Sequence, residues 1–285
     1  MSIPPGLAES LAAKCLCDSL HSDVQLGQTR HRIKLVNAWQ ISSGSNVLEI
    51  GCGQGDCTAV LASVTGESGH VDAIDPAPLS YGSPWTLGQA QSHLSNGDLG
   101  GRISWHQTSP IKFLESVTTE SKYDVAVLAH CIWYFPTRTV LVDIARALRG
   151  KAKRVCVAEY ALSASVPEAM PHVLVALAAA TLEAHRTKSD SNIQSVISPR
   201  EISDIFEAEG WKLKAAQTLT PEQDYLDGSW EVGSVKDKSF LKSIDENIDD
   251  ERVRLVLRSM RDAVIASISC IKVARTQDVW IASFE

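Results

Sequence analysis

Asn46–Asp56 is the stretch that decides the fold of this chain, and it reads Asn-Val-Leu-Glu-Ile-Gly-Cys-Gly-Gln-Gly-Asp. Its apolar first half is typical of a buried parallel strand, and glycines at alternating positions follow that strand. Glycines at this spacing let the backbone turn sharply and approach a ligand where a side chain would collide. A helix is predicted over Cys57–Val64, with Asp56 accepting hydrogen bonds from its first free backbone N–H groups. Because a helix N-terminus favours a negatively charged or polar group, the stretch predicts a nucleotide pocket.

A glycine-rich loop alone also fits a tight strand-to-helix turn with no ligand, but three neighbouring features favour the pocket. Glu49 stands at the strand end, where a purely structural strand would carry an apolar residue. A second strand-like run, His70–Ile74, ends in Asp75, which lies about 20 residues beyond the loop, as a ribose-binding acid does in dinucleotide folds. Asp56 occupies the place of the third glycine of a dinucleotide fingerprint, and this pattern disfavours NAD.

Val47–Gly55 resembles the first motif of the class I S-adenosylmethionine-dependent methyltransferases, and Asp75 falls on the ribose-binding acid of that family. Tyr123–Phe135 and Leu141–Gly150 resemble the fourth strand and next helix of the small-molecule branch, the ubiquinone-biosynthesis-like enzymes. The resemblance covers residues 45–214 and the last strand. The residues around Asp75-Pro76 are similar to methyltransferase-like proteins of fungal secondary metabolism.

Strand-like and helix-like segments alternate beyond the loop, which predicts an α/β fold with a doubly wound, mostly parallel seven-stranded sheet, the Rossmann-like methyltransferase fold. The predicted strands are Val47–Ile50, His70–Ile74, Arg102–His106, Tyr123–Ala129, Arg154–Tyr160, Trp211–Gln217 and Val279–Phe284. Further helices are predicted over Pro84–Leu94, from Pro136 to Gly150, and over Pro199–Glu209.

The chain divides into three predicted parts. Residues 1–43 form an N-terminal helical segment, and residues 44–165 with 199–285 form the S-adenosylmethionine-binding core. Residues 166–198 and 228–276 are helical insertions that we expect to cap the pocket and select the substrate. In the resembling family the N-terminal helices often close over cofactor and substrate, so Gln28, Arg30 and Tyr81 are either contacts or surface polar residues.

Composition narrows the function. The 285 residues are 44% hydrophobic, which allows a full core, and the net charge of −7 argues against a nucleic-acid binder. The basic run Arg30–Lys34 is predicted to be a solvated helix face. Met1–Gly6 lacks the basic start of a secretory signal, and Val173–Leu182, the most apolar stretch, is too short to span a bilayer.

The cysteines predict reduced thiols in a cytoplasmic protein. Cys15 and Cys17 lack the partners and spacing of a zinc site, and no metal is expected. We expect a monomer or homodimer that acts on a small molecule, with no nucleic-acid or membrane partner. The seven cysteines are Cys15, Cys17, Cys52, Cys57, Cys131, Cys156 and Cys270.

The resemblance implies S-adenosylmethionine as the cofactor and assigns residues to it. Glu49 would hold the methionine end, directly or through water, and Asp75 would accept both ribose hydroxyls. The family usually carries an acid after the third strand to accept from the adenine amino group. This chain has Gln107-Thr108-Ser109 instead, so Thr108, Gln107 or a backbone carbonyl would make that contact. The remaining candidates along the cofactor are Gly51, Cys52, Gly53, Pro76 and His130.

His130 is the candidate general base, because it follows the fourth strand at its carboxyl end and imidazole titrates near neutral pH. A structural or cofactor-contacting histidine is the alternative. Trp133 and Tyr134 form an aromatic wall for a flat substrate or pack against the next helix. Tyr160 ends the fifth strand toward the pocket, and His172 on the predicted cap helix is either a substrate contact or simply accommodated there.

These features predict a methyltransferase that uses S-adenosylmethionine to methylate a small organic acceptor, with oxygen favoured over nitrogen or carbon. The rival hypothesis is a methyltransferase-fold protein that binds S-adenosylmethionine without transferring methyl, as a structural binder or as a catalyst of rearrangement or cyclisation. The glycines and Asp75 predict cofactor binding in both cases.

Overall fold

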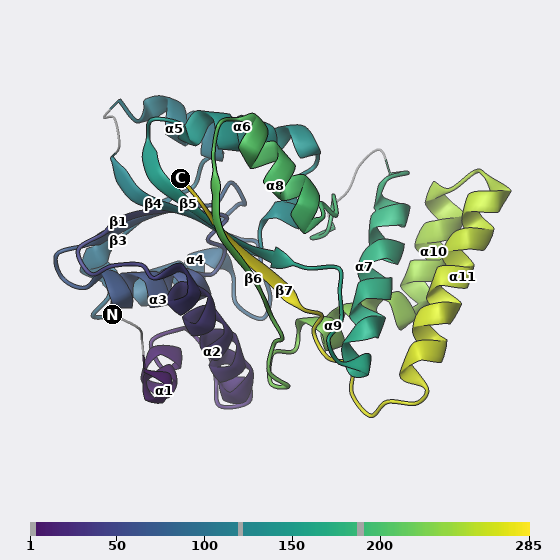
Figure 1. Ribbon diagram of the computed structural model, residues 1–285. Helices are drawn as coiled ribbons and strands as arrows, with labels where there is room; N and C mark the ends of the chain where they lie inside the picture. The colour runs from purple at the N-terminus through teal and green to yellow at the C-terminus, as the bar shows by residue number, and fades with distance from the viewer. Residues whose placement is uncertain (1–3, 119–121, 187–190) are drawn as a thin grey trace.

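The computed structural model describes residues 4–118, 122–186 and 191–285, and it centres on one seven-stranded sheet (Figure 1). The strand order is β3-β2-β1-β4-β5-β7-β6; β1 to β5 run parallel, and β7 is antiparallel to both of its neighbours. This confirms the predicted doubly wound fold. The strands are β1 (Asn46–Ile50), β2 (His70–Ile74), β3 (Ile103–His106), β4 (Tyr123–Ala129), β5 (Ala152–Tyr160), β6 (Leu213–Leu219) and β7 (Val279–Phe284).

Helices cover both faces of the sheet (Figure 1). One face carries α1 (Ala8–Ala12), α2 (Ser22–Trp39), α3 (Asp56–Thr65) and α4 (Leu87–Ser95). The other carries α5 (Pro110–Ser116), α6 (Arg138–Leu148) and α8 (Pro199–Ala208). Short 3₁₀ helices occur at Pro5–Leu7, Gly100–Arg102, Ile132–Tyr134 and Pro167–Ala169.

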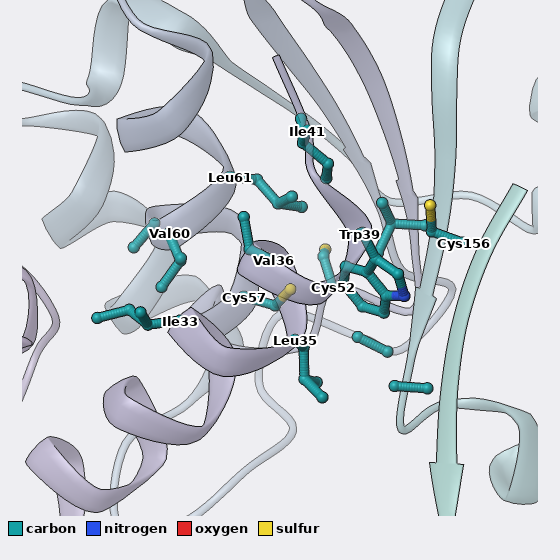
Figure 2. Close-up of a cluster of buried hydrophobic side chains, with 14 of the residues drawn as sticks. Ile33, Leu35, Val36, Trp39, Ile41, Cys52, Cys57, Val60, Leu61 and Cys156 are labelled. Atoms are coloured by element: carbon teal, nitrogen blue, oxygen red, sulfur yellow. The ribbon is translucent and has the colours of Figure 1, made fainter. Parts of the chain in front are cut away.

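Helix α2 is anchored by a buried apolar cluster, shown in Figure 2. Val36 and Trp39 from α2 join Val60 and Leu61 from α3 and Cys156 from β5, and all five side chains are buried. Burying such side chains contributes on the order of 1.5–3 kcal/mol each for the larger aliphatic ones. The cluster therefore fixes α2 against the sheet. It also fixes the position of the polar α2 residues that precede the clustered residues by one helical turn.

Four further helices, α7 (Met170–Glu183), α9 (Asp227–Lys236), α10 (Lys238–Asn247) and α11 (Glu251–Ile268), form a lobe beside the sheet where β5 leads into α7 (Figure 1). The lobe has its own apolar cluster, separate from the two clusters on the faces of the sheet. Members of this cluster include Val175, Val232, Phe240, Leu257 and Val264.

The helices differ from the sequence prediction at several points, of which three concern the glycine loop and its neighbours. Asp56 does not cap α3: Gly55 is the N-cap residue, and the Asp56 carboxylate accepts a hydrogen bond from Gln25 Nε2 at 2.8 Å. Helix α4 begins at Leu87, because Thr86 forms a capping box with Gln89 three residues later. The short helix α5 was not predicted.

The prediction of a solvated face over Arg30–Lys34 was wrong. His31 and Ile33 are 3% and 4% exposed, because residues 222–227 lie across this side of α2. His31 stacks on Tyr225 with ring centroids 4.0 Å apart, and Arg30 pairs with Asp224 at 2.9 Å. These partners lie nearly 200 positions away in the sequence, so the local pattern does not reveal them.

The described residues contain neither a membrane-spanning helix nor a metal-binding cluster. None of their helices is both long and apolar enough to cross a membrane. No group of three or more His, Cys, Asp or Glu side chains in this part of the chain is arranged to hold a metal ion.

Replacing the loop glycines separates packing from backbone strain. An added Cβ at Gly51 would lie 2.4 Å from Cys131 Cβ, whereas at Gly53 nothing lies within 4 Å, although φ is positive at both (76° and 53°). Gly51→Ala is expected to lower the free energy of unfolding by roughly 2–5 kcal/mol, the sum of a left-handed backbone and overpacking. Gly53→Ala is expected to cost about 1–2 kcal/mol from the backbone alone. Urea unfolding measures both, and equal losses would contradict the close approach at Gly51.

Candidate active site

A cavity of about 640 Å³, here called the donor cavity, lies against the glycine loop at the carboxyl ends of β1 and β4. Parallel sheets of this type bind ligands at that edge, where the strand order reverses, here between β1 and β4. Its lining combines Glu49, Gly51, Cys52 and Gly53 from the loop with Arg32, Gln54, Tyr81, Ala129, His130, Tyr134 and Asn192, among others.

The loop glycines leave room for a ligand. Gly55 has φ 96°, and a Cβ there would lie 2.7 Å from both Leu94 and Trp105, so this position needs glycine for packing. Gly53 also has positive φ, but a Cβ there would meet open space. Gly53 therefore presents bare backbone to the donor cavity, as a loop that closely approaches a ligand does.

Asp75 stands beside the loop, outside the residues that line the donor cavity. Its Oδ2 accepts the Gly53 backbone N–H and its Oδ1 accepts the Ala77 N–H, both at 2.9 Å. Each carboxylate oxygen keeps a second lone pair, so two hydroxyl groups could still be bound. Thr108 is a neighbour of Asp75, because both backbone N–H groups donate to the His106 carbonyl, and Pro76 is exposed.

Glu49 is 1% exposed, and its Oε2 accepts a hydrogen bond from Thr58 Oγ1 at 2.6 Å. Burial raises the pKa of this carboxyl to about 7, although hydrogen bonds from Thr58 and Cys57 oppose the shift. The group therefore titrates near neutral pH. A ligand with a positive charge in the donor cavity would favour its ionised form.

Arg32 is a lining residue that the sequence analysis did not select. Its Nη1 donates to Tyr225 Oη at 3.2 Å. Burial alone would lower the pKa of Arg32, but Tyr225, Cys57 and Asp227 raise it, so the guanidinium stays charged. The available signal was helical spacing, because Arg32 lies three and four residues before the buried Leu35 and Val36.

His130 is buried at the end of β4 in an unusual backbone conformation. Its φ is 54°, which costs a non-glycine residue about 1–3 kcal/mol and is typical of functional sites. The backbone N–H donates to the Ala158 carbonyl, and the ring Nε2 lies 2.9 Å from His31 Nε2. Its Nδ1 is 3.6 Å from Glu159 Oε1. Burial lowers the pKa of His130, although Glu159 opposes the shift.

Of the four predicted substrate residues, one lines the cavities, and the other three are not among the lining residues. Tyr134 lines the donor cavity and is 53% exposed. Trp133 is buried, and its indole N–H donates to the Ile197 carbonyl at 3.0 Å. Tyr160 Oη donates to Asp227 at 2.6 Å, and His172 is fully buried with Nε2 2.8 Å from Glu231.

A second cavity of about 570 Å³, here called the lobe cavity, lies between α7, α9, α10 and residues 191–193. It shares Tyr134 and Asn192 with the donor cavity, so the two spaces adjoin. Asp227 and Glu231 from α9 line it. Sequence reasoning missed both carboxylates, because the segment that carries them shows no motif.

Known proteins resemble this chain over the glycine loop and beyond. A family model described as a methyltransferase domain matches residues 47–151. The chain is 27% identical to the methyltransferases phomM and phomM' of the fungus Diaporthe leptostromiformis, covering 93% of this chain and 86% of each relative.

Solved structures extend the comparison to the whole fold. A cyclopropane-fatty-acyl-phospholipid synthase-like protein from Lactobacillus casei is 27% identical, covers 99% of both chains and superposes with a TM-score of 0.87. The cyclase SpnF shares only the fold, with a TM-score of 0.53 at 11% identity over 98% of this chain and 92% of its own. The sheet order, the glycine-loop cavity and these matches support a class I S-adenosylmethionine-dependent methyltransferase, with residues 47–151 as the matched methyltransferase domain.

Proposed function

We propose that this methyltransferase transfers the methyl group to a hydroxyl oxygen of a small organic acceptor. In this proposal the donor cavity holds S-adenosylmethionine and the lobe cavity holds the acceptor. The observation that carries it is the shared wall: Tyr134 and Asn192 line both cavities, so a molecule in each can meet there. The lobe helices then act as the cap that selects the acceptor, and the net charge of −7 favours a small acceptor over a nucleic acid.

Polar groups of both signs suit the two ends of the cofactor. The backbone at Gly51, Cys52 and Gly53 would pass along it, since Gly53 presents no side chain there. Glu49 would face the amino group of the methionine end, and Arg32 supplies a fixed positive charge for its carboxylate. The second lone pairs of Asp75 would accept the ribose hydroxyls, with Pro76 and Thr108 on the adenine side.

The bound cofactor supplies an activated methyl group on a sulfonium centre. The protein then has to align the acceptor oxygen with that methyl group and exclude water. A hydroxyl acceptor must also lose a proton, which requires a base. His130 lines the donor cavity and its lowered pKa keeps the ring neutral at pH 7, so it can accept a proton.

The contact between His31 and His130 determines how that proton is held. Glu159 faces His130 Nδ1 at 3.6 Å and favours a proton on this nitrogen. His130 Nε2 then carries a lone pair, which accepts the N–H of His31 Nε2 across 2.9 Å. Proton uptake by His130 requires His31 to turn its N–H away, so α2 and β4 would take part together.

Methyl transfer is tested by incubating the protein with deuteromethyl-labelled S-adenosylmethionine and a panel of small phenols and alcohols. We expect S-adenosylhomocysteine and labelled product in equal amounts by mass spectrometry. His130→Gln should reduce turnover by about 10²–10⁴-fold, the usual contribution of a general base. The wild-type rate should fall as the pH drops through the His130 pKa, below 6.5, because the protonated ring cannot accept a proton.

Three results of this assay would count against the proposal. Cofactor binding without S-adenosylhomocysteine across the panel would favour the rival hypothesis of a fold that no longer transfers methyl. An unchanged pH–rate profile in His130→Gln would remove the base role. Label on nitrogen or carbon would replace O-methylation.

Asp75→Ala is expected to weaken S-adenosylmethionine binding by about 1–3 kcal/mol, because the two ribose hydroxyls lose the carboxylate that accepts their hydrogen bonds. The same change frees the Gly53 and Ala77 N–H groups, so the loop is less well held. Asp124→Ala is the control: its carboxylate caps the Asn46 N–H at the opposite end of β1. Calorimetric titration measures both variants, and equal affinities for the two would refute the ribose assignment.

We predict that cofactor binding is linked to proton release from Glu49. If this carboxyl titrates near 7 when free and faces an ammonium group when the cofactor binds, binding near pH 7 should release protons from it. Calorimetry in buffers of different ionisation enthalpy counts the protons. We expect wild-type protein to release more than Glu49→Gln at pH 6.5–7.5, about the interval in which the group titrates. The same count in both proteins would exclude Glu49 from the contact.

A further inference from the structure

We propose that the lobe cavity is built for an acceptor that carries a positively charged amino group on an aromatic or apolar body. The inference rests on the proposed function, because it assigns the acceptor to this cavity. It concerns the group that anchors the acceptor, which is separate from the oxygen that receives the methyl group. The cavity volume of about 570 Å³ is large enough for a molecule of this kind.

Asp227 and Glu231 lie one helical turn apart on α9 and both line the cavity. The Asp227 carboxylate accepts hydrogen bonds from Gln28 Nε2 at 2.9 Å and Tyr160 Oη at 2.6 Å, and both donors are neutral. Burial alone would raise the pKa of Asp227, but the Tyr160 and Tyr225 hydroxyls and the charge of Arg32 lower it. Asp227 therefore stays anionic.

Glu231 accepts a hydrogen bond from a neutral donor, as the tautomer of His172 shows. The Gln277 backbone N–H donates to His172 Nδ1 at 3.1 Å, so this nitrogen carries no proton. His172 is then a neutral imidazole, and its Nε2–H donates to Glu231 Oε2 at 2.8 Å. The histidine orients the carboxylate without cancelling its charge.

Few positive charges face these carboxylates. Among the residues that the structure describes, Arg186 is the basic residue of the lining, and it is already paired with Glu183 at 3.3 Å. Arg32 acts on Asp227 from the donor cavity, and within the described part of the chain Glu231 is paired with the neutral imidazole of His172. The lining is therefore negative, and anionic side chains held by neutral donors are arranged to attract a cation.

Aromatic surface in the same wall suits both parts of such an acceptor. Trp230 lies between the two carboxylates in the sequence of α9 and is 53% exposed, as is Tyr134. Exposed indole and phenol faces attract an ammonium group by about 0.5–2 kcal/mol and also pack against a flat apolar ring. Phe240 of α10 contributes apolar surface on the lobe side.

The experiment compares three probes that share a phenol ring and differ in the charge of the tail: tyramine, 4-ethylphenol and 3-(4-hydroxyphenyl)propionate. Each is titrated into the protein with and without saturating S-adenosylhomocysteine. We expect tyramine to bind about tenfold or more tightly than 4-ethylphenol, the propionate to bind most weakly, and high salt to reduce the difference.

Substitutions test whether the two carboxylates cause the preference for tyramine. Glu231→Gln and Asp227→Asn should each reduce the preference for tyramine severalfold and leave binding of 4-ethylphenol nearly unchanged. Glu246→Gln is the matched control, because this exposed carboxylate of α10 pairs with Lys242 and does not line the cavity. Retained S-adenosylhomocysteine binding shows that each variant is folded, and Glu231, with its side chain partly exposed, is the less disruptive of the two sites.

Equal binding of the three probes, no binding of tyramine, or a preference that survives in both variants would overturn the inference. These outcomes are distinct from failure of the proposed function. That function fails when the cofactor product does not bind or when no methyl group is transferred, whereas the charge preference is measured independently of both.

Discussion

The close approach of two loops at the carboxyl ends of β1 and β4 is the constraint on which the site depends. Gly51 follows β1 and packs so tightly on Cys131 that no side chain fits between them. The Cys131 thiol donates to the Ile50 carbonyl at 3.1 Å and fixes the same contact. Two residues further on, Gly53 faces open space in the donor cavity, and His130 leaves its strand with positive φ.

The sequence predicts what local pattern determines. Three strands, His70–Ile74, Tyr123–Ala129 and Val279–Phe284, match the structure at both ends, because each is an apolar run bounded by polar or turn residues. Helix α5 was missed because its seven residues are too few for a helical period to show. The glycine loop and Asp75 were found through their fixed spacing, and the structure places them side by side, although their contacts with the cofactor stay a prediction.

The rest of the candidate site lies beyond local pattern, because its partners are distant in the chain. Arg32 was expected in solvent, and only the tertiary fold brings Tyr225 across it. Asp227 is joined to Gln28 over 199 positions and to Tyr160 over 67. No motif marks such pairs, since α2 and β5 supply the neutral donors and α9 supplies the carboxylate. The lobe cavity consequently became visible only in the folded chain.

The position of β7 has a consequence for how this protein is made. The strand nearest the end of the sequence lies inside the sheet, paired with β5 on one side and β6 on the other (Figure 1). Strands β1 to β5, with the glycine loop, can pair as they leave the ribosome, whereas β6 emerges with no neighbour to join. Its backbone groups stay unpaired until β7 (Val279–Phe284) has been synthesised. The nascent chain thus has an exposed sheet edge, and chaperone binding at that stage would protect this edge from aggregation.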